Sequence, residues 1–341
     1  MRFFAPSLLA AFLAFLGPVS AFEGVNYKVT KTVPLGMPDR WDYVVFDPIL
    51  DRVYVSHGEV VTVVDGNSGA ITGTITVGGI THGIASVHGL GKGYTDDGKS
   101  GVAVAFDLKT LKVLNRIKVE EDADGIVYDP RSGHVLVITG DSGKVAVIDP
   151  KTDTVVATID GGGGLEFGVL DGNGKFYVDG EKNNEIVRMD LATNKADAHW
   201  ALTGCKTPHG LAIDRAHMRL FASCANKTMV VVNAETGVVI ATLAIGQGTD
   251  FAEFDSRLGL AFSSNRDGTL SVIKEVNPDK FVGLQPVATT YGAKTMALNP
   301  KTERIYLVAS DVADNDAAKT ERERHAVKAG TVKLLFLDPS R

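Results

Sequence analysis

Residues 124–159 read DGIVYDPRSGHVLVITGDSGKVAVIDPKTDTVVATI and contain four short runs of β-branched and other apolar residues. The first three runs are each followed by a cluster of turn-forming residues, for example Pro130 to Gly133 and Gly140 to Gly143. Runs of this length between turn residues predict β-strands joined by tight turns, not helices. The stretch therefore predicts one small antiparallel sheet of four strands.

Seven copies of this unit follow one another along the chain. The residue at the start of its first strand recurs at steps of 40, 42, 42, 43, 41 and 44 residues. These seven positions, hereafter the ring residues, are Asp42, His82, Asp124, Glu166, His209, Asp250 and Lys294. An Asp or Asn that ends the third strand, from Asp65 to Asn233, keeps the same spacing. Such a period predicts an all-β fold, a seven-bladed β-propeller of four-stranded antiparallel blades. Residues 22–341 would form this single domain.

The two ends of the domain are expected to close the ring. Residues 28–36 (KVTKTVPLG) resemble an outer strand that precedes the first complete unit, whereas the last unit ends after its third strand, VKLLFLD. Pairing the N-terminal strand with the last blade would complete that blade. Because both end strands would then be paired, neither would leave an open sheet edge.

The first 21 residues have the features of a secretory signal peptide. Arg2 supplies a positive charge, Leu8 to Leu16 form a short apolar core, and Val19-Ser20-Ala21 offers small residues at a cleavage site. The apolar run is too short to span a membrane, so we expect cleavage after Ala21 and no membrane span in the mature chain. The protein is therefore predicted to be periplasmic or secreted.

The two cysteines of the chain, Cys205 and Cys224, are predicted to form a disulfide. Cys205 lies in the loop that leads into the fifth blade, and Cys224 follows the second strand of that blade. Both loops project from one face, and an exported protein favours pairing of its thiols. The alternative is two free thiols that act as metal ligands beside His209.

The seventh unit carries an insertion at residues 311–330, DVADNDAAKTERERHAVKAG. This largely polar stretch of twenty residues stands where the other copies have a short turn. We expect either a short helix around Ala317 to Ala329 or a mobile segment. The insertion is either a solvated excursion or a lid or partner-docking segment, because long loops are often functional.

The ring residues carry the chemistry that the sequence predicts. All seven are ionisable, and the fold would gather them around one mouth of the central channel. Asp124, Glu166 and His209 come from consecutive blades and form the predicted ligand set for one divalent metal ion, which His82 would complete or orient. One imidazole and two carboxylates suit Zn²⁺, Mn²⁺ or Fe²⁺ better than Ca²⁺. Lys294 would hold an anionic group.

Two further residues, Asp96 and Arg266, are expected at the rim of the same face, in loops between second and third strands. The alternatives are that the ring residues only cap turns, or that they bind a polar ligand directly. Trp41 and Phe167, next to ring residues, would stack on a ligand or pack between blades. The chain has no G-x-S-x-G, H-E-x-x-H or C-x-x-C motif, so no catalytic motif can be placed.

Several segments resemble a known repeat. These are RVYVSHG at 52–58, KFYVDGE at 175–181, RIYLVAS at 304–310, VIDPKTDTVVATI at 147–159 and GLAFSSNRDGTL at 259–270. They are similar to the YVTN repeat, and the whole mature chain resembles YncE-like proteins of the YVTN β-propeller family. The resemblance implies a periplasmic or extracellular propeller. It implies no catalytic residue, because the repeat encodes strands and turns.

Two classes of function follow. The first is a binding propeller, expected to be a monomer, that takes a small polar ligand or an envelope protein partner on its loop-rich face. The alternative is a metal-dependent hydrolase or lyase, similar to a lactonase, with its site at the channel mouth. The net charge of −6 is spread along the chain without a basic stripe, so we expect no nucleic-acid partner.

Overall fold

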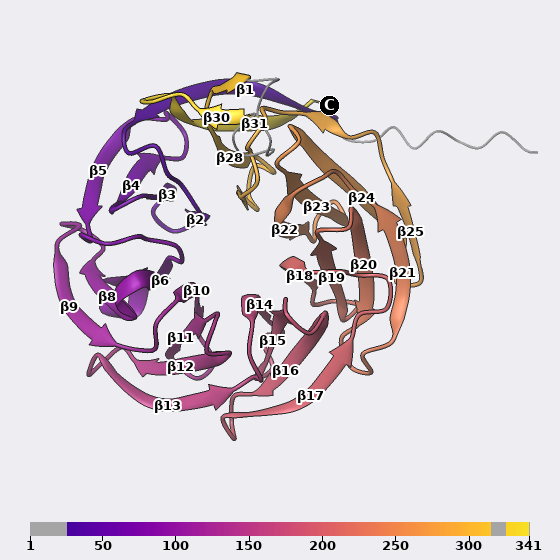
Figure 1. The fold of residues 1–341 in the computed structure, drawn as a ribbon, viewed down its shortest axis with the longest axis horizontal. Coiled ribbons are helices and arrows are strands. Elements are labelled where there is room, and N and C mark those ends of the chain that lie inside the picture. The colour runs from indigo at the N-terminus through magenta and orange to yellow at the C-terminus, as the bar shows by residue number, and fades with distance from the viewer. Residues whose placement is uncertain (1–25, 315–324, 341) are drawn as a thin grey trace, which may run out of the picture.

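The computed structural model describes residues 26–314 and 325–340, which form a ring of seven blades around a central axis (Figure 1). The seven-bladed propeller predicted from the repeat is confirmed. Each blade is an antiparallel sheet whose first strand lies nearest the axis and whose fourth strand forms the outer rim. The ring residues lie at or just before the start of these first strands.

Blades 1 to 4 follow the repeat without interruption. Blade 1 comprises β2 (Val44–Asp47), β3 (Arg52–His57), β4 (Val60–Asp65) and β5 (Ile71–Thr76). Blade 2 comprises β6 (Ala85–Val87), β7 (Lys92–Asp97), β8 (Val102–Asp107) and β9 (Val113–Lys118). Blade 3 comprises β10 (Ala123–Asp129), β11 (His134–Thr139), β12 (Lys144–Asp149) and β13 (Thr154–Asp160). Blade 4 comprises β14 (Leu165–Leu170), β15 (Lys175–Gly180), β16 (Glu185–Asp190) and β17 (Lys195–Ala201).

Blades 5 to 7 include the irregular parts of the ring. Blade 5 comprises β18 (Pro208–Asp214), β19 (Arg219–Cys224), β20 (Thr228–Asn233) and β21 (Val239–Ala244). Blade 6 comprises β22 (Thr249–Asp255), β23 (Leu260–Asn265) and β24 (Thr269–Asn277), whose outer side pairs with both β25 (Lys280–Gly283) and β26 (Val287–Ala288). Blade 7 comprises β27 (Met296–Leu298), β28 (Ile305–Ala309), β31 (Val332–Ser340) and the N-terminal β1 (Asn26–Gly36).

The N-terminal strand closes the ring, as the sequence predicts. β1 pairs antiparallel with β31 from Asn26 opposite Ser340 to Gly36 opposite Val332. This pairing joins the two ends of the described chain within one sheet, so that the last blade has its full set of four strands (Figure 1). Each end strand thereby has a hydrogen-bonded neighbour.

The repeated Asp or Asn at the end of each third strand shapes the turn that follows it. Asp65 Oδ1 accepts hydrogen bonds from the backbone N–H groups of Asn67 and Ser68 at 3.2 and 2.7 Å, and Asn233 Oδ1 accepts two equivalent bonds. Four residues after this position the backbone φ is positive, at Gly69, Leu111, Asp153, Asn194 and Gly237. The repeated residue is therefore a turn-former, which explains its regular spacing.

Seven clusters of buried apolar side chains fill the gaps between neighbouring blades. Tyrosines on second strands also cross these gaps: Tyr177 donates its hydroxyl hydrogen bond to Ala234 O at 2.9 Å, and Tyr306 donates to Gly66 O at 2.8 Å. One blade cannot bury both faces of its sheet, whereas a closed ring of blades buries both.

The insertion in blade 7 differs from the expected helix. It contains a two-stranded hairpin, β29 (Val312–Asp314) with β30 (His325–Val327), so the C-terminal part of the predicted helical stretch is a strand. Residues 315–324 lie outside the described residues. The hairpin reaches the loops of the mouth face, because Gly330 N–H donates to Asp39 Oδ1 at 2.6 Å and the His325 ring lies 4.2 Å from that of Tyr291.

The predicted disulfide is confirmed between Cys205 and Cys224, whose Cα atoms lie 5.5 Å apart. The bond ties the loop leading into blade 5 to the end of β19. Both cysteines are buried in the cluster between blades 4 and 5. A disulfide fits an exported protein.

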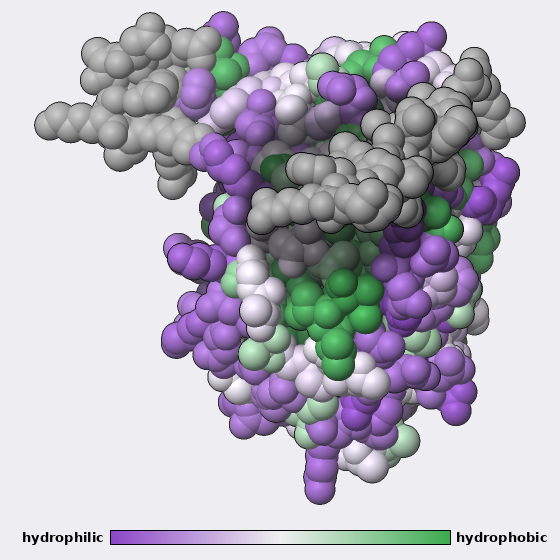
Figure 2. Space-filling model, turned by 90° about the vertical axis from the view of Figure 1, so that its right-hand side faces the viewer, coloured by the Kyte–Doolittle hydropathy of each residue, from purple (hydrophilic) through white to green (hydrophobic). Residues whose placement is uncertain are grey.

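One side of the outer rim is mostly hydrophilic where Figure 2 shows it. Figure 2 shows the side at which β21, β24 and β25 run, where a small group of hydrophobic residues is surrounded by hydrophilic ones. The exposed apolar side chains of these strands include Val276 and Val282. Within residues 26–314 and 325–340, no helix is long and apolar enough to cross a lipid bilayer.

Candidate functional site

The ring residues gather at one mouth of the central channel, and three of them form an ion-paired group. Lys294 Nζ contacts Asp250 Oδ2 in an ion pair and lies 3.8 Å from Asp42 Oδ1. Burial alone would lower the pKa of Lys294, but the Asp250 and Asp42 charges outweigh it and raise the pKa overall. Lys294 is therefore a fixed cation between blades 6 and 1. Arg266, exposed in the loop between β23 and β24, lies close enough to repel it.

His82 is held by Asp96. His82 Nδ1 lies 2.8 Å from Asp96 Oδ1, and the backbone N–H of Gly83 donates to Asp96 Oδ2 at 2.7 Å. Asp96 is a residue of β7 and is completely buried, so it does not form part of an exposed rim as the sequence suggested. Burial raises the pKa of Asp96 to about 6, although His82 opposes this. Burial alone would lower the pKa of His82, but the hydrogen bond to Asp96 and the Asp96 charge raise it overall.

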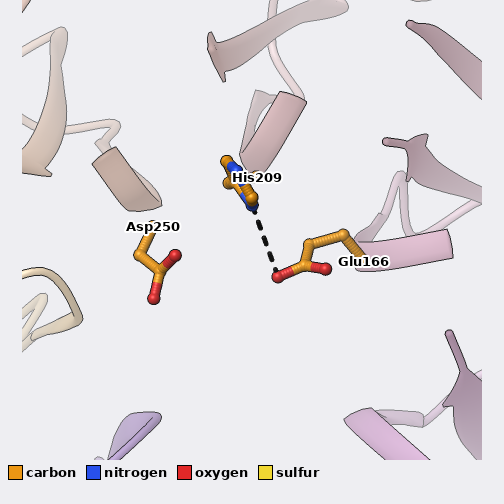
Figure 3. A group of neighbouring side chains, drawn as sticks. All are labelled: Glu166, His209 and Asp250. Atoms are coloured by element: carbon orange, nitrogen blue, oxygen red, sulfur yellow. Dashed lines mark ion pairs between the residues drawn. The ribbon is translucent and has the colours of Figure 1, made fainter. Parts of the chain in front are cut away.

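A second group of three ring residues, which shares Asp250 with the first, brings metal-binding atoms together. One donor atom each from Glu166, His209 and Asp250 lies within 4.8 Å of the other two, on the consecutive blades 4, 5 and 6 (Figure 3). His209 Nδ1 lies 3.7 Å from Glu166 Oε1, which is too long for a hydrogen bond. Two donors that bind one ion at about 2.0–2.5 Å can be at most about 5 Å apart. The group is therefore within the span of one cation.

The predicted ligand set overlaps this group in Glu166 and His209 but differs in the third carboxylate. Asp250 lies with them, whereas Asp124 lies outside the group of three, and His82 is engaged by Asp96. Burial raises the pKa of Asp124 well above its usual range, and the Glu166 and Asp42 charges add to the effect. Burial also raises the pKa of Glu166, and the neighbouring Glu166 raises that of His209.

A further acid, Asp179, lies beneath this part of the ring. Asp179 is on β15, has no exposed surface, and neither carboxyl oxygen has a hydrogen-bond partner in the described structure. Burial raises its pKa well above the usual range; Glu166 adds to the effect, and His209 opposes it. A buried carboxyl group without a partner is costly, so it requires a physical explanation. His209 Nδ1 is likewise buried without a hydrogen bond.

Sequence reasoning did not identify Asp179, although a signal was present. Asp179 stands in an otherwise apolar strand, KFYVDG, at the position that Asp96 occupies in KGYTDD of blade 2. An acid inside a strand that is buried on both faces is unusual. Comparing the second strands copy by copy singles out these two acids.

An aromatic layer closes the channel below the ring. Tyr43, Phe167 and Phe251 each follow a ring residue in sequence, and their ring centroids lie 4.6 to 5.7 Å apart. The three residues come from blades 1, 4 and 6, which are not neighbours, so these contacts cross the axis. Phe167 thus packs in the channel itself. Trp41 lies against the apolar cluster between blades 7 and 1.

The charges at the mouth are unevenly distributed. Lys294 compensates Asp42 and Asp250, and His82 compensates Asp96. On blades 3 and 4, the Glu166 charge raises the pKa of both Asp124 and Asp179, and His209 opposes the shifts of Glu166 and Asp179. Like charges at short range raise the pKa of the carboxyl groups or recruit a cation. This side of the mouth is therefore suited to a bound cation.

Comparisons with known proteins support the fold alone. No family model matches the sequence, and no curated protein matches it. A chain in the Kuenenia stuttgartiensis hydrazine synthase structure aligns with a TM-score of 0.70 and 14% identity, covering 81% of this chain and 94% of that chain. A chain in the crystal structure of a mitotic checkpoint complex aligns with a TM-score of 0.73 and 15% identity, covering 100% and 99% of the two chains. Identities this low carry no functional inference.

Proposed function

We propose that this protein is an exported binding propeller, related to the YVTN β-propeller family, whose channel mouth takes a divalent cation through Glu166, His209 and Asp250. The observation that carries the proposal is that their donor atoms lie within 4.8 Å of one another, next to carboxyl groups that lack a compensating charge. The ion would offset the repulsion between Glu166, Asp124 and Asp179. Three protein ligands leave coordination positions for oxygen atoms of a small polar ligand.

The chemistry of the donors narrows the choice of ion. An imidazole with two carboxylates favours Zn²⁺, Mn²⁺ or Fe²⁺ over Ca²⁺, which prefers six or more oxygen ligands. The nearby Lys294 would contribute to holding an anionic ligand, because one of its two carboxylate partners, Asp250, would share its charge with the metal. The ring would thus take a metal ion on one side and an anionic group on the other.

Metal analysis of natively purified protein tests this proposal. We expect about one equivalent of a divalent ion, and a melting temperature that rises when Mn²⁺ or Zn²⁺ is added to chelator-treated protein, because a ligand that binds only the folded state stabilises it. Glu166→Gln and His209→Ala should each abolish both effects. No stoichiometric metal and no thermal response to Mn²⁺, Zn²⁺ or Ca²⁺ would contradict the metal site and leave a surface for direct binding of a polar ligand.

A matched control comes from the outer face of blade 4. His199 Nδ1 and Glu185 Oε2 lie 3.2 Å apart there, so His199→Ala and Glu185→Gln remove the same residue types away from the channel. Both control variants should keep the metal content and the thermal response. Equal losses in the control and mouth variants would indicate general destabilisation.

One observation favours an enzymatic alternative, a metal-dependent hydrolase or lyase similar to a lactonase. Asp124 lies at the same mouth, where burial and the Glu166 charge raise its pKa well above the usual range and so favour its protonated form. A protonated acid near a metal ion can act as a general acid. Lactone hydrolysis that is lost in Asp124→Asn, with metal content retained, would support the alternative. Activity that is absent from metal-loaded wild-type protein would argue against it.

A further inference from the structure

A cavity lies at the end of the channel opposite the ring residues. This cavity, hereafter the lower chamber, has a volume of about 470 Å³ and is lined by the first strands of blades 3 to 6. Its walls include Val127, Leu170 and Ile213, and Phe167 and Phe251 of the aromatic layer form its inner end. A volume of this size is within the range of sites for small molecules.

The aromatic layer separates the lower chamber from the mouth. Phe167 follows Glu166, and Phe251 follows Asp250, so one residue of each strand faces the proposed metal site and the next faces the chamber. The two sites therefore share strands but offer different chemistry. The mouth is lined by ionisable groups, whereas the chamber is largely apolar and aromatic.

Glu253 is the acid placed within the chamber. It lines both this cavity and a smaller neighbouring one of about 180 Å³, which Tyr43 and Phe46 also line. Within residues 26–314 and 325–340, no side chain donates a hydrogen bond to its carboxylate. Burial raises the pKa of Glu253 to about 7, although a hydrogen bond from the Phe254 backbone and the Arg215 charge oppose the shift. An acid in such a place is costly when ionised and uncompensated.

Two other charged residues face the chamber, and both are engaged elsewhere. Asp129 uses its oxygens to accept the backbone N–H groups of Arg131 and Ser132 at 3.0 and 3.1 Å. Arg215 is exposed at the opening and donates its Nε–H to Leu170 O at 2.8 Å. Water weakens the field of an exposed guanidinium. The charged groups facing the chamber, Glu253 and Asp129 against Arg215, leave an excess of one negative charge.

We propose that the lower chamber binds a small organic cation, an ammonium group on an apolar body about the size of one aromatic ring. The ammonium would donate to the Glu253 carboxylate and supply the charge that it lacks. The apolar body would pack against Phe167 and Phe251, whose ring faces also attract cations. Neither an anion nor a neutral molecule would compensate Glu253.

Calorimetric titration of the full chain at pH 8 tests the proposal. The protein is treated with a chelator first, so that a metal ion at the mouth does not contribute to the measured binding. The probes are 2-phenylethylammonium, its neutral counterpart 2-phenylethanol, and phenylacetate. We expect the ammonium to bind at least about tenfold more tightly than the alcohol, and phenylacetate to bind most weakly. Equal or tighter binding of the alcohol or the anion would overturn the proposal, as would the absence of binding by all three.

Two variants locate the site. Glu253→Gln keeps the shape of the side chain, so it should retain the fold and remove the preference for the ammonium. Arg215→Gln removes the opposing positive charge at the opening and should tighten ammonium binding by about two- to threefold. Glu185→Gln, on the outer face of blade 4, is the control and should bind as wild type does. An unchanged preference in Glu253→Gln would also overturn the proposal, as would weaker ammonium binding in Arg215→Gln.

Discussion

Asp96 on β7 and Asp179 on β15 occupy the same position in their blades, but within the part of the chain that the structure describes only Asp96 has hydrogen-bond partners. The difference arises at the ring residue of the same blade. In blade 2 the ring residue beside the buried acid is His82, whereas in blade 4 it is Glu166, a second carboxyl group. Because like charges repel, Asp179 is compensated only by a proton or by a cation nearby.

Replacing Asp179 with Asn should stabilise the chelator-treated protein at pH 7.5 by at least about 1 kcal/mol, since a shift of one pKa unit corresponds to about 1.4 kcal/mol. The folded-state pKa of this acid is raised, so its contribution to stability is greatest below the unfolded-state pKa and is lost as the pH rises. Most of the gain from Asn should therefore be lost near pH 4, where the acid is protonated in the folded state and about half protonated in the unfolded state. Urea unfolding of wild type and Asp179→Asn at pH 7.5 and pH 4 measures this difference in the free energy of unfolding.

Asp141, exposed in the turn after β11, provides the control for Asp179. Asp141→Asn should change the free energy of unfolding by less than about 0.5 kcal/mol at either pH. A gain in Asp179→Asn that is the same at pH 4 and pH 7.5 would show that the carboxyl charge is not its cause.

Replacing Lys294 with Met should lower the free energy of unfolding by about 3 kcal/mol, because it leaves Asp42 and Asp250 without their shared cation. The same variant should bind a divalent cation more tightly than wild type, since Asp250 loses a competing partner and the mouth becomes more negative. Urea unfolding of the metal-free form and calorimetric titration with Mn²⁺ measure the two effects.

Lys144 is the matched control for Lys294, because its ion pair with Glu120 is at the surface, with side chains 38% and 51% exposed. Lys144→Met should leave the urea midpoint close to that of wild type, because an exposed ion pair contributes little to stability, and it should leave Mn²⁺ affinity unchanged. If both lysine variants lose the same stability, the pairs at the mouth contribute no more than a surface pair.

Removing the disulfide by the double substitution Cys205→Ala and Cys224→Ala should lower the free energy of unfolding by about 3 kcal/mol. The bond closes a loop with a sequence separation of 19 residues, and its loss enlarges the unfolded ensemble. Wild type unfolded in a reducing agent should give the same midpoint as the double variant. An identical midpoint for oxidised wild type and the double variant would contradict the expectation.

The mature protein should begin at Phe22. The prediction rests on the charged start, apolar core and small residues of the first 21 positions, which lie outside the described residues. N-terminal sequencing of protein recovered from the periplasm or the medium tests it. Recovery of exported protein that begins at Met1 would refute cleavage at Ala21.

The repeat made the fold predictable because its signals are local. Each turn depends on residues within it, such as Asp65 with Asn67 and Ser68, and each strand on a short apolar run. The insertion was harder to predict. Its residues favour a helix, so the sequence did not indicate that β29 and β30 pair. In this pairing Val312 lies opposite Val327, and a polar stretch of chain connects the two strands.

The sequence alone determined the ring of seven blades, its closure by the N-terminal strand, the position of the disulfide and the set of ionisable residues at the mouth. Only the tertiary structure decided which of those residues are partners. Lys294 pairs with Asp250, His82 pairs with Asp96, and Asp250 replaces Asp124 beside Glu166 and His209. The reason is that these contacts, within one blade for His82 and Asp96 and between neighbouring blades for Lys294 and Asp250, depend on rotamers and on burial. Neither is encoded in the spacing of the repeat.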